Sequence, residues 1–196
     1  MSRQAERSEA TRTVLIAAAR ALFAERGYAG VGTVEIVERA GSSRGAMYHH
    51  FKDKKELFRA VYEQVQEEIV ARIGAAMGDA GDDPIAALRT GLRVFLDTCL
   101  ERDKARIGLV DAPAVLGWET WREIDERYAL GLVTAGLEQG RAAGVLRTDV
   151  PLRPLAHMVL ASLAEAGLLI AGSDDPETAR REALPAVLAF LDGLRA

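Results

Sequence analysis

The hydrophobic pattern has the period of an α-helix along almost the whole chain. Apolar residues recur three and four positions apart, and no stretch alternates as a strand would or repeats itself. One such stripe near the N-terminus consists of Val14, Leu15, Ala18, Ala19, Leu22 and Phe23. Glycines and short polar runs such as 78–83 (GDAGDD) separate the stripes. The sequence therefore predicts an all-α fold.

The breaks between stripes define the expected helices. Residues 1–7 (MSRQAER) read as a disordered basic arm. Pro84 suits the first turn of a helix, and Pro185 lies where it should kink one. We expect helices over 8–26, 33–40, 44–50, 52 to 73 or 77, 84–102, 104–116, 117–143 and 155–171, with a last one after 175.

The stretch from Thr33 to Phe51 reads as two short helices joined by a tight turn. Gly41 provides a turn residue without a Cβ, and Ser43 can cap the second helix. Met47 and Phe51 are four apart, so they share one face that must be buried. The other faces carry a cation, a glycine and two ring donors, which a short helix would expose only to dock on something. This pattern fits a helix-turn-helix whose second helix enters the DNA major groove.

The segment GYAGVGTVEIVERAGSSRGAMYHHFKDKKELF resembles the DNA-binding region of the TetR family of transcriptional repressors. The residues that carry the resemblance are Gly27, Tyr28, Ile36, Ala40, Gly41, Ser43, Gly45, Tyr48, His50, Phe51, Lys54 or Lys55, Leu57 and Phe58. The resemblance implies a three-helix DNA-binding domain, expected at 9–69 with the motif at about 32–51. It also implies a helical domain for effector binding and dimerisation, expected at 70–196.

Four positions depart from the family pattern. Threonines are usual at Val31 and Gly32, a small alanine at Val37, and a valine at Ser42. The changes in the first helix of the motif, at Gly32 and Val37, are the only feature that favours one alternative, a helical small-molecule-binding or adaptor protein that does not bind DNA.

The charge distribution separates the two parts of the chain. The net charge is −4, which by itself argues against a nucleic-acid partner. Residues 1–60, however, hold 11 Lys or Arg and 7 Asp or Glu, whereas residues 61–196 hold 14 and 22. A basic head on an acidic body predicts that the nucleic-acid surface lies in the head.

Several side chains of the head are candidates for DNA contact. Arg44 and Tyr48 lie one turn apart, so they can reach a base edge and a phosphate together. Lys55 lies near a helix N-terminus, which itself binds phosphate. The expected DNA-binding residues are Thr33, Ser43, Arg44, Gly45, Tyr48, His49, Lys52 and Lys55. Alternatively, Tyr48 and His50 pack and the cations are merely solvated, and His50 is the strongest candidate for packing.

The family resemblance also implies a small effector inside the larger domain. Trp118 and Trp121 are three apart and share a face, which makes them the preferred pocket residues. The candidate pocket residues are Phe95, Cys99, Trp118, Trp121, Tyr128, His157, Met158 and Ser162. The alternative is that these aromatic residues belong to the core, as they usually do at helical spacing.

The helix expected at 155–171 is apolar nearly all round, so both of its sides should be covered. One side can pack on its own domain, and the other needs a second chain. Together with the last helix it suggests a four-helix dimer interface, which the resemblance also implies. The expected interface residues are Leu160, Leu163, Leu184, Val187, Leu188 and Leu191.

Other functional classes find little support. The chain has no G-x-S-x-G, no phosphate-binding glycine loop and no H-E-x-x-H, so we expect neither an enzyme nor a cofactor or metal. Cys99 is the single cysteine and excludes an intrachain disulfide. The N-terminus lacks the apolar run of a signal peptide, so we expect none. Residues 155–171 look too short and too polar for a membrane span. We therefore predict a cytoplasmic, homodimeric repressor that binds a near-palindromic DNA operator and is released by a small hydrophobic effector.

Overall fold

The computed structural model describes the backbone of residues 3–196 and the side chains from Ala5 onward. Within these residues the fold is all-α, as predicted, and the β-structure is one isolated bridge between Leu146 and Arg195. The α-helices are α1 Arg3–Arg26, α2 Thr33–Arg39, α3 Arg44–His50, α4 Lys54–Asp79, α5 Pro84–Thr98, α6 Arg102–Lys104, α7 Ala112–Leu116, α8 Trp118–Asp125, α9 Gly131–Ala142, α10 Leu152–Ala171 and α11 Pro176–Asp192. Two π-helical segments, η1 Ala105–Asp111 and η2 Glu126–Leu130, join α6 to α7 and α8 to α9.

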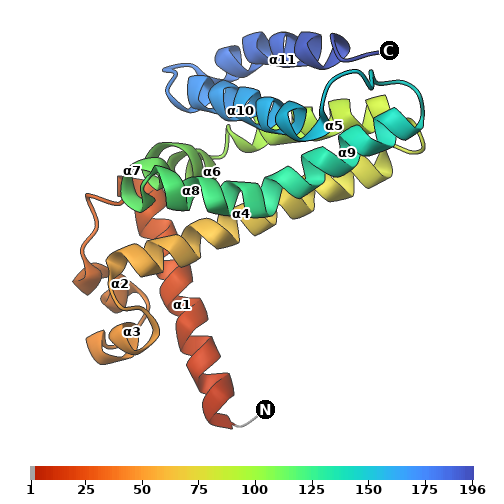
Figure 1. Cartoon of the computed structure of the whole chain (residues 1–196). Coiled ribbons are helices and arrows are strands. Elements are labelled where there is room, and N and C mark those ends of the chain that lie inside the picture. The colour runs from red at the N-terminus through yellow and green to blue at the C-terminus, as the bar shows by residue number, and fades with distance from the viewer. Residues whose placement is uncertain (1–2) are drawn as a thin grey trace.

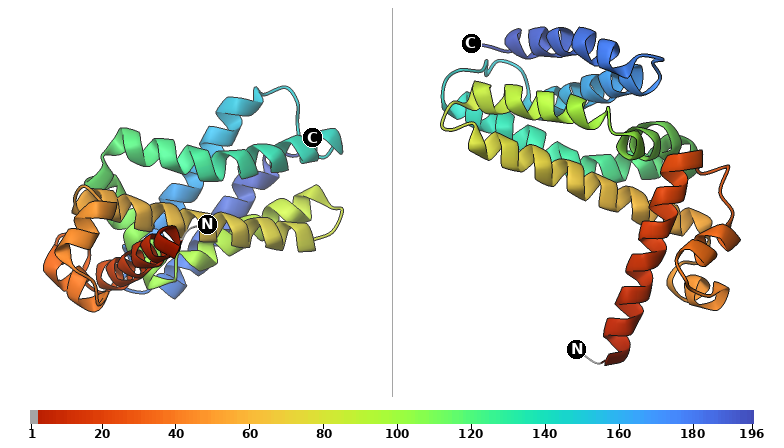
Figure 2. Two further views of the ribbon diagram at one scale, coloured as in Figure 1. Left: turned by 90° about the horizontal axis from the view of Figure 1, so that it is seen from below. Right: turned by 180° about the vertical axis from the view of Figure 1, so that it is seen from behind.

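Helix α1 differs most from its prediction. It begins at Arg3, so residues 3–7 of the expected disordered arm are helical, while residues 1–2 lie outside the described part. Its N-terminal half projects away from the rest of the molecule (Figures 1 and 2). Val14 was expected in the buried stripe but is 46% exposed. Helix α1 buries only the side that meets the other elements, where Leu15 and Phe23 are fully covered.

Three further boundaries differ from the prediction. Helix α4 continues through Gly78 to Asp79, and α5 ends at Thr98, short of residue 102. Pro113 does not interrupt the helix expected over 104–116, and it lies in the first turn of α7, which continues directly from η1.

The head consists of α1, α2, α3 and the start of α4, around a small aromatic core. The rings of Phe23, Tyr28 and Phe58 lie with centroids 5.2–5.7 Å apart. Met47 and Phe51 are 0% and 2% exposed, as their spacing predicted. Because both contribute to this core, α3 is held against the head by one side only.

The body is layered. Helices α4 and α9 lie on the side nearer the head, α5 lies in the middle, and α10 and α11 lie farthest from the head (Figure 1). Its core is built from leucines and other apolar residues of α5, α9, α10 and α11. Helix α4 is continuous from the head into the body, so it connects the two mechanically.

Helix α10 differs from the expectation that residues 155–171 are too short and too polar for a membrane span. It begins at Leu152, which makes it 20 residues long, and it is apolar enough to cross a membrane by length and composition. It lies against α5, α9, α11 and η1, with residues such as Ala156 and Ile170 completely covered. Helix α10 is therefore a core helix.

The head is attached to the body by an apolar cluster shared with η1, α7 and α8 and by polar contacts with α4, α6 and η1. Arg20 of α1 bonds Glu68 of α4 at 2.7 Å and Asp103 of α6 at 2.6 Å. The Tyr28 backbone N–H donates to Asp111 of η1 at 2.8 Å. These bonds tie the base of α1, and the turn that follows it, to the segment that covers the body.

Candidate nucleic-acid interface and effector cavity

Local chemistry explains why α3 forms where it does. Gly41 has φ +58°, a conformation that suits glycine, and this turns the chain between α2 and α3. Ser43 is extended, and its hydroxyl accepts a hydrogen bond from the Ala46 N–H at 3.1 Å. The predicted turn and cap are both confirmed.

The outer face of α3 carries the predicted DNA-reading residues. Arg44, Gly45, Tyr48 and His49 are exposed, and Tyr48 is 52% exposed. Within the described residues the Arg44 guanidinium and the Tyr48 hydroxyl have no hydrogen-bond or ionic partner. A large aromatic side chain that is half exposed beside an unpaired cation is an unusual surface for a helix whose other side is core.

The other predicted DNA contacts surround this face. Lys52 and Lys55 are exposed at the start of α4, and Thr33 is half-buried at the start of α2. The Ser43 hydroxyl is engaged as the α3 cap. His50 is half-buried and its ring lies against Phe51, with centroids 6.2 Å apart, so its packing role fits the geometry.

Lys54 and Lys55 are neighbours with different environments. The Lys54 ammonium donates to the carbonyls of Tyr28 and Val31, each at 2.9 Å, and lies 4.0 Å from the Tyr28 ring centroid. Burial lowers the pKa of Lys54. Lys55 points to solvent, with no partner among the described residues. Lys54 thus holds the turn before α2, and Lys55 is free to meet a phosphate.

The departures from the family pattern leave the motif intact. Gly32 has no side chain with which to cap α2, but the Glu35 carboxylate accepts from the Gly32 N–H at 3.2 Å and from Arg26 at 2.7 Å. Val37 is 7% exposed and fills the core between the two helices. Neither change removes the docking face.

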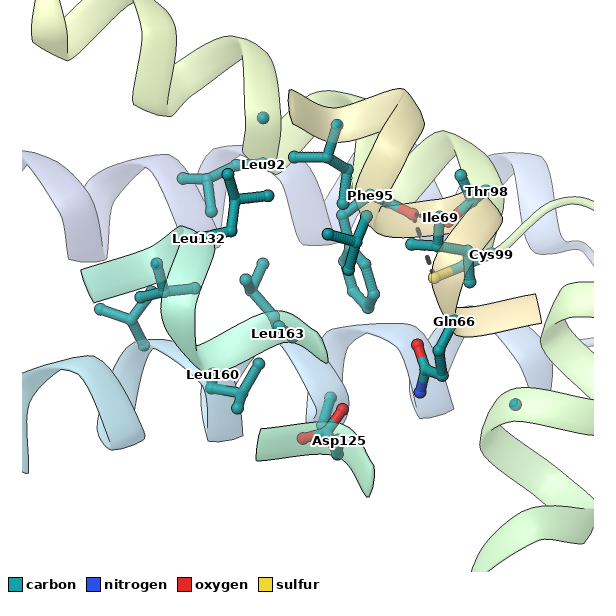
Figure 3. A pocket seen from close by; sticks show the side chains of 18 of the residues that line it. Gln66, Ile69, Leu92, Phe95, Thr98, Cys99, Asp125, Leu132, Leu160 and Leu163 are labelled. Carbon is teal, nitrogen blue, oxygen red and sulfur yellow. Dashed lines mark hydrogen bonds between the residues drawn. The ribbon is translucent and has the colours of Figure 1, made fainter. Parts of the chain in front are cut away.

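The body contains a cavity of about 90 Å³ lined by residues of α4, α5, α6, η1, α8, η2, α9 and α10 (Figure 3). Most of its lining is aliphatic. Of the eight predicted pocket residues, Phe95, Cys99 and Trp121 line it.

The other five predicted pocket residues lie elsewhere. Trp118 and Met158 are 62% and 64% exposed. The Tyr128 hydroxyl donates to Glu67 at 3.0 Å, and the Ser162 hydroxyl donates to the Val159 carbonyl at 2.7 Å. His157 lies between Glu126 and Arg122 outside the cavity. Sharing a face with Trp121 did not bring Trp118 inward, because α8 begins at Trp118.

Cys99 was predicted, but the other polar side chains that line the cavity, those of Gln66, Thr98, Lys104 and Asp125, were not. Gln66 and Asp125 lie on the same side of it, away from Leu92 (Figure 3). The available signals were a glutamine inside the apolar stripe of α4 and a carboxylate one turn after Trp121 on α8. Burial raises the pKa of Asp125 to about 6, and the neighbouring Glu126 raises it further while Arg122 opposes the shift.

Cys99 lines the cavity but is chemically quiet. Burial raises the pKa of its thiol to about 12, and the thiol donates to the Phe95 carbonyl (dashed line in Figure 3). A thiol held in its protonated form is a poor nucleophile. The described residues also contain no cluster of three or more His, Cys, Asp or Glu side chains that could hold a metal ion.

Two family models match the chain. One, described as "Bacterial regulatory proteins, tetR family", covers residues 15–61. The other, described as "Tetracyclin repressor-like, C-terminal domain", covers residues 85–194, more than half of the chain. The chain belongs to the TetR family. It is a TetR-type DNA-binding transcriptional regulator, and this is a non-enzymatic family.

Curated relatives support this assignment. The TetC protein of transposon Tn10 from Escherichia coli is 33% identical over 132 residues, which are 67% of this chain and 66% of that protein. The chain thus spans slightly less than two thirds of the length of TetC. The transcriptional repressor AcnR of Corynebacterium efficiens is 30% identical over 165 residues, 79% of this chain and 78% of AcnR.

Solved structures of TetR regulators share the whole fold. A TetR-family regulator from Pectobacterium atrosepticum superposes with a TM-score of 0.86 at 34% identity, covering 100% of this chain and 98% of that one. RolR in complex with resorcinol superposes with a TM-score of 0.73 at 26% identity, covering 95% of this chain and 89% of RolR. The match extends over head and body together, which leaves the adaptor alternative without support.

The residues expected at a TetR dimer interface divide into two groups. Leu160, Leu163, Val187 and Leu191 are buried inside their own chain, and the first two line the cavity. Leu184 and Leu188 are half-buried. The large apolar side chains that α10 and α11 leave exposed are Met158, Leu168, Leu169 and Phe190.

Proposed function

We propose that the protein is a homodimeric repressor that binds a near-palindromic operator and releases it when a small, mainly apolar effector enters the cavity of the body. The observation that carries the proposal is the outer face of α3. Arg44 and Tyr48 are exposed and unpaired there, while Met47 on the opposite side is completely buried. A helix gripped on one side, with a guanidinium and a phenol on the other, suits the major groove.

Dimerisation is proposed through the outer faces of α10 and α11. The exposed residues Met158, Glu165, Leu168 and Leu169 fall on one side of α10, and Phe190 is 40% exposed on α11. Apolar side chains gathered on one surface commonly mark a protein interface. Two copies would form a four-helix bundle in which Glu165 lies close to the partner subunit. The two α3 helices would then read half-sites about 34 Å apart or a multiple of it.

Effector binding would act on the heads through η1. Gly108 and Leu109 of this segment line the cavity, while Asp111 bonds the Tyr28 N–H of the head. An effector shifts the operator equilibrium only by its difference in affinity between the two head positions. Two relatives support the proposal: AcnR is named a repressor, and RolR was solved with resorcinol.

The domain division and the compartment are also proposals. The head is assigned to 9–69 and the body to 70–196, although α4 crosses this boundary without a break. A regulator that binds chromosomal DNA would work in the cytoplasm.

The direct test is a mobility-shift titration with promoter fragments from the gene's own neighbourhood. The wild-type protein should shift one fragment specifically, and an Arg44→Ala, Tyr48→Ala double variant should bind it at least about 100-fold more weakly, since each good base contact contributes about 1–3 kcal/mol. Arg93→Ala, which removes an exposed arginine of the body, is the matched control and should bind normally. Unchanged affinity in the double variant would refute the proposal.

A further inference from the structure

The cavity has a polar end made by four side chains from two helices. Tyr62 and Gln66 come from α4, one turn apart, and the Gln66 Nε2 donates to the Tyr62 hydroxyl at 2.5 Å. Trp121 and Asp125 come from α8, also one turn apart. Gln66, Trp121 and Asp125 line the cavity. Tyr62 and Trp121 belong to the same buried cluster, so the two pairs lie in one region of the core. Burial and the Asp125 carboxylate raise the pKa of the Tyr62 hydroxyl.

The other polar groups that line the cavity already have partners. The Thr98 hydroxyl donates to the Phe95 carbonyl at 2.6 Å, and the Cys99 thiol donates to the same oxygen at 3.3 Å. The Lys104 ammonium pairs with Glu101. A bound molecule would gain little by competing for these groups.

Three groups at the polar end have no hydrogen-bond partner within the described residues: the Trp121 Nε1–H, the Asp125 carboxylate and the side-chain oxygen of Gln66, whose amide nitrogen alone is bonded. The Nε1–H of Trp121 is buried without a hydrogen-bond partner; the indole lies near the Tyr62 hydroxyl, but outside hydrogen-bond geometry. The Asp125 carboxylate accepts no hydrogen bond from the protein, although its residue is only partly accessible. A buried donor and a sheltered acceptor that both lack partners are costly unless something satisfies them.

The chemistry of the missing partner follows from this pair. A hydroxyl can donate to Asp125 and accept from Trp121 at the same time. An ammonium group has no lone pair for Trp121, and a carboxylate has no proton for Asp125 and would meet like charge. Most of the rest of the lining, including Leu92, Leu132 and Leu163, is apolar (Figure 3).

We propose that the cavity selects a compact, uncharged molecule of one ring or similar size that carries a hydroxyl group, which bridges Asp125 and the Trp121 Nε1–H. This inference rests on the proposed function in taking the cavity as the effector site. The space of about 90 Å³ that is open to water-sized spheres favours a compact ligand. Phenol is therefore the probe that fits both the size and the polar end.

Calorimetric titration with single-ring probes tests the chemistry directly, without DNA. Phenol should bind on the order of ten- to a hundredfold more tightly than toluene or anisole, because a hydrogen bond to an ionised acceptor contributes about that factor. Toluene is the more hydrophobic molecule, so burial alone predicts the opposite order. Benzoate and benzylammonium should bind more weakly than phenol.

Variants at Asp125 separate the hydrogen bond from the shape of the cavity. Asp125→Leu should abolish the preference for phenol over toluene while toluene still binds. Asp125→Asn removes the charge and adds an amide donor, so benzoate should gain at least about tenfold relative to phenol. Glu123→Gln, which neutralises an exposed carboxylate two residues away on α8, is the matched control and should keep the wild-type order.

The outcomes distinguish this inference from the proposed function. Toluene or benzoate binding the wild-type protein as tightly as phenol, or no binding of phenol at millimolar concentration, would overturn the hydroxyl assignment. Operator binding is measured separately by mobility shift with and without phenol. If phenol binds in the predicted order but leaves the operator complex intact, the ligand chemistry stands and the release mechanism under the proposed function fails.

Discussion

The outer face of α3 and the polar end of the cavity are built in opposite ways. Arg44 and Tyr48 belong to one seven-residue helix and reach solvent without partners. Gln66, Trp121 and Asp125 come from helices about 60 residues apart in sequence and meet only in the folded body. The outer face of α3 can contact a partner because it is exposed, and its charged and polar side chains are hydrated in the free protein. The polar end of the cavity has its polar groups sheltered from water, so their pairing affects stability as well as binding.

The largest expected effect comes from the two faces of α3 itself. Met47→Ala removes a completely buried side chain from the head core and should lower the free energy of unfolding by about 2–5 kcal/mol. Tyr48→Ala changes a half-exposed neighbour and should lower it by less than about 0.5 kcal/mol, while operator binding is lost. Denaturant unfolding of both variants measures the difference. Equal losses of stability would mean that Tyr48 is a packing residue.

The next effect concerns the cavity and depends on pH. Burial raises the pKa of Asp125 from 3.8 to about 6. Between these values the folded protein binds more protons than the unfolded chain, so this carboxyl lowers stability as the pH rises from about 4 to about 6. Asp125→Asn should therefore be more stable than wild type by up to about 3 kcal/mol at pH 8 and nearly equal to it at pH 3.

The measurement is the difference in unfolding free energy between variant and wild type across this pH range. Glu123→Gln is the control on the same helix, and its difference from wild type should stay nearly constant with pH. A constant difference for Asp125→Asn as well would contradict the sheltered environment of this carboxyl.

The smallest effect compares adjacent lysines. Lys54→Met keeps the apolar stem against Tyr28 but removes two hydrogen bonds, so it should lower the free energy of unfolding by about 1–3 kcal/mol. Lys55→Met should leave stability within about 0.5 kcal/mol and reduce the slope of log affinity against log salt by about 0.9. Mobility shifts at several salt concentrations give the slope. If the slope of log affinity against log salt changed only in the Lys54 variant, Lys54 and not Lys55 would be the phosphate contact.

Glycines show how far sequence reasoning reaches. Gly131, Gly136 and Gly140 weaken a helix by propensity, and a helical glycine can also allow the close approach of another element. A Cβ on Gly136 would lie 2.7 Å from Leu88, and one on Gly140 would lie 2.5 Å from Leu146, whereas Gly131 has nothing within 4 Å. The sequence alone allows a close approach at all three glycines, but a packing partner exists at only two of them.

The sequence by itself determined the helical periods, the turn at Gly41, the Ser43 cap and the buried pair Met47 and Phe51. Each of these depends on residues within one or two turns, so local spacing contains the information. Only the tertiary structure decided that Trp121 lines the cavity while Trp118 does not, and that Leu160 turns inward. Those outcomes depend on which element covers each helix face, and the covering residues lie far away in the chain.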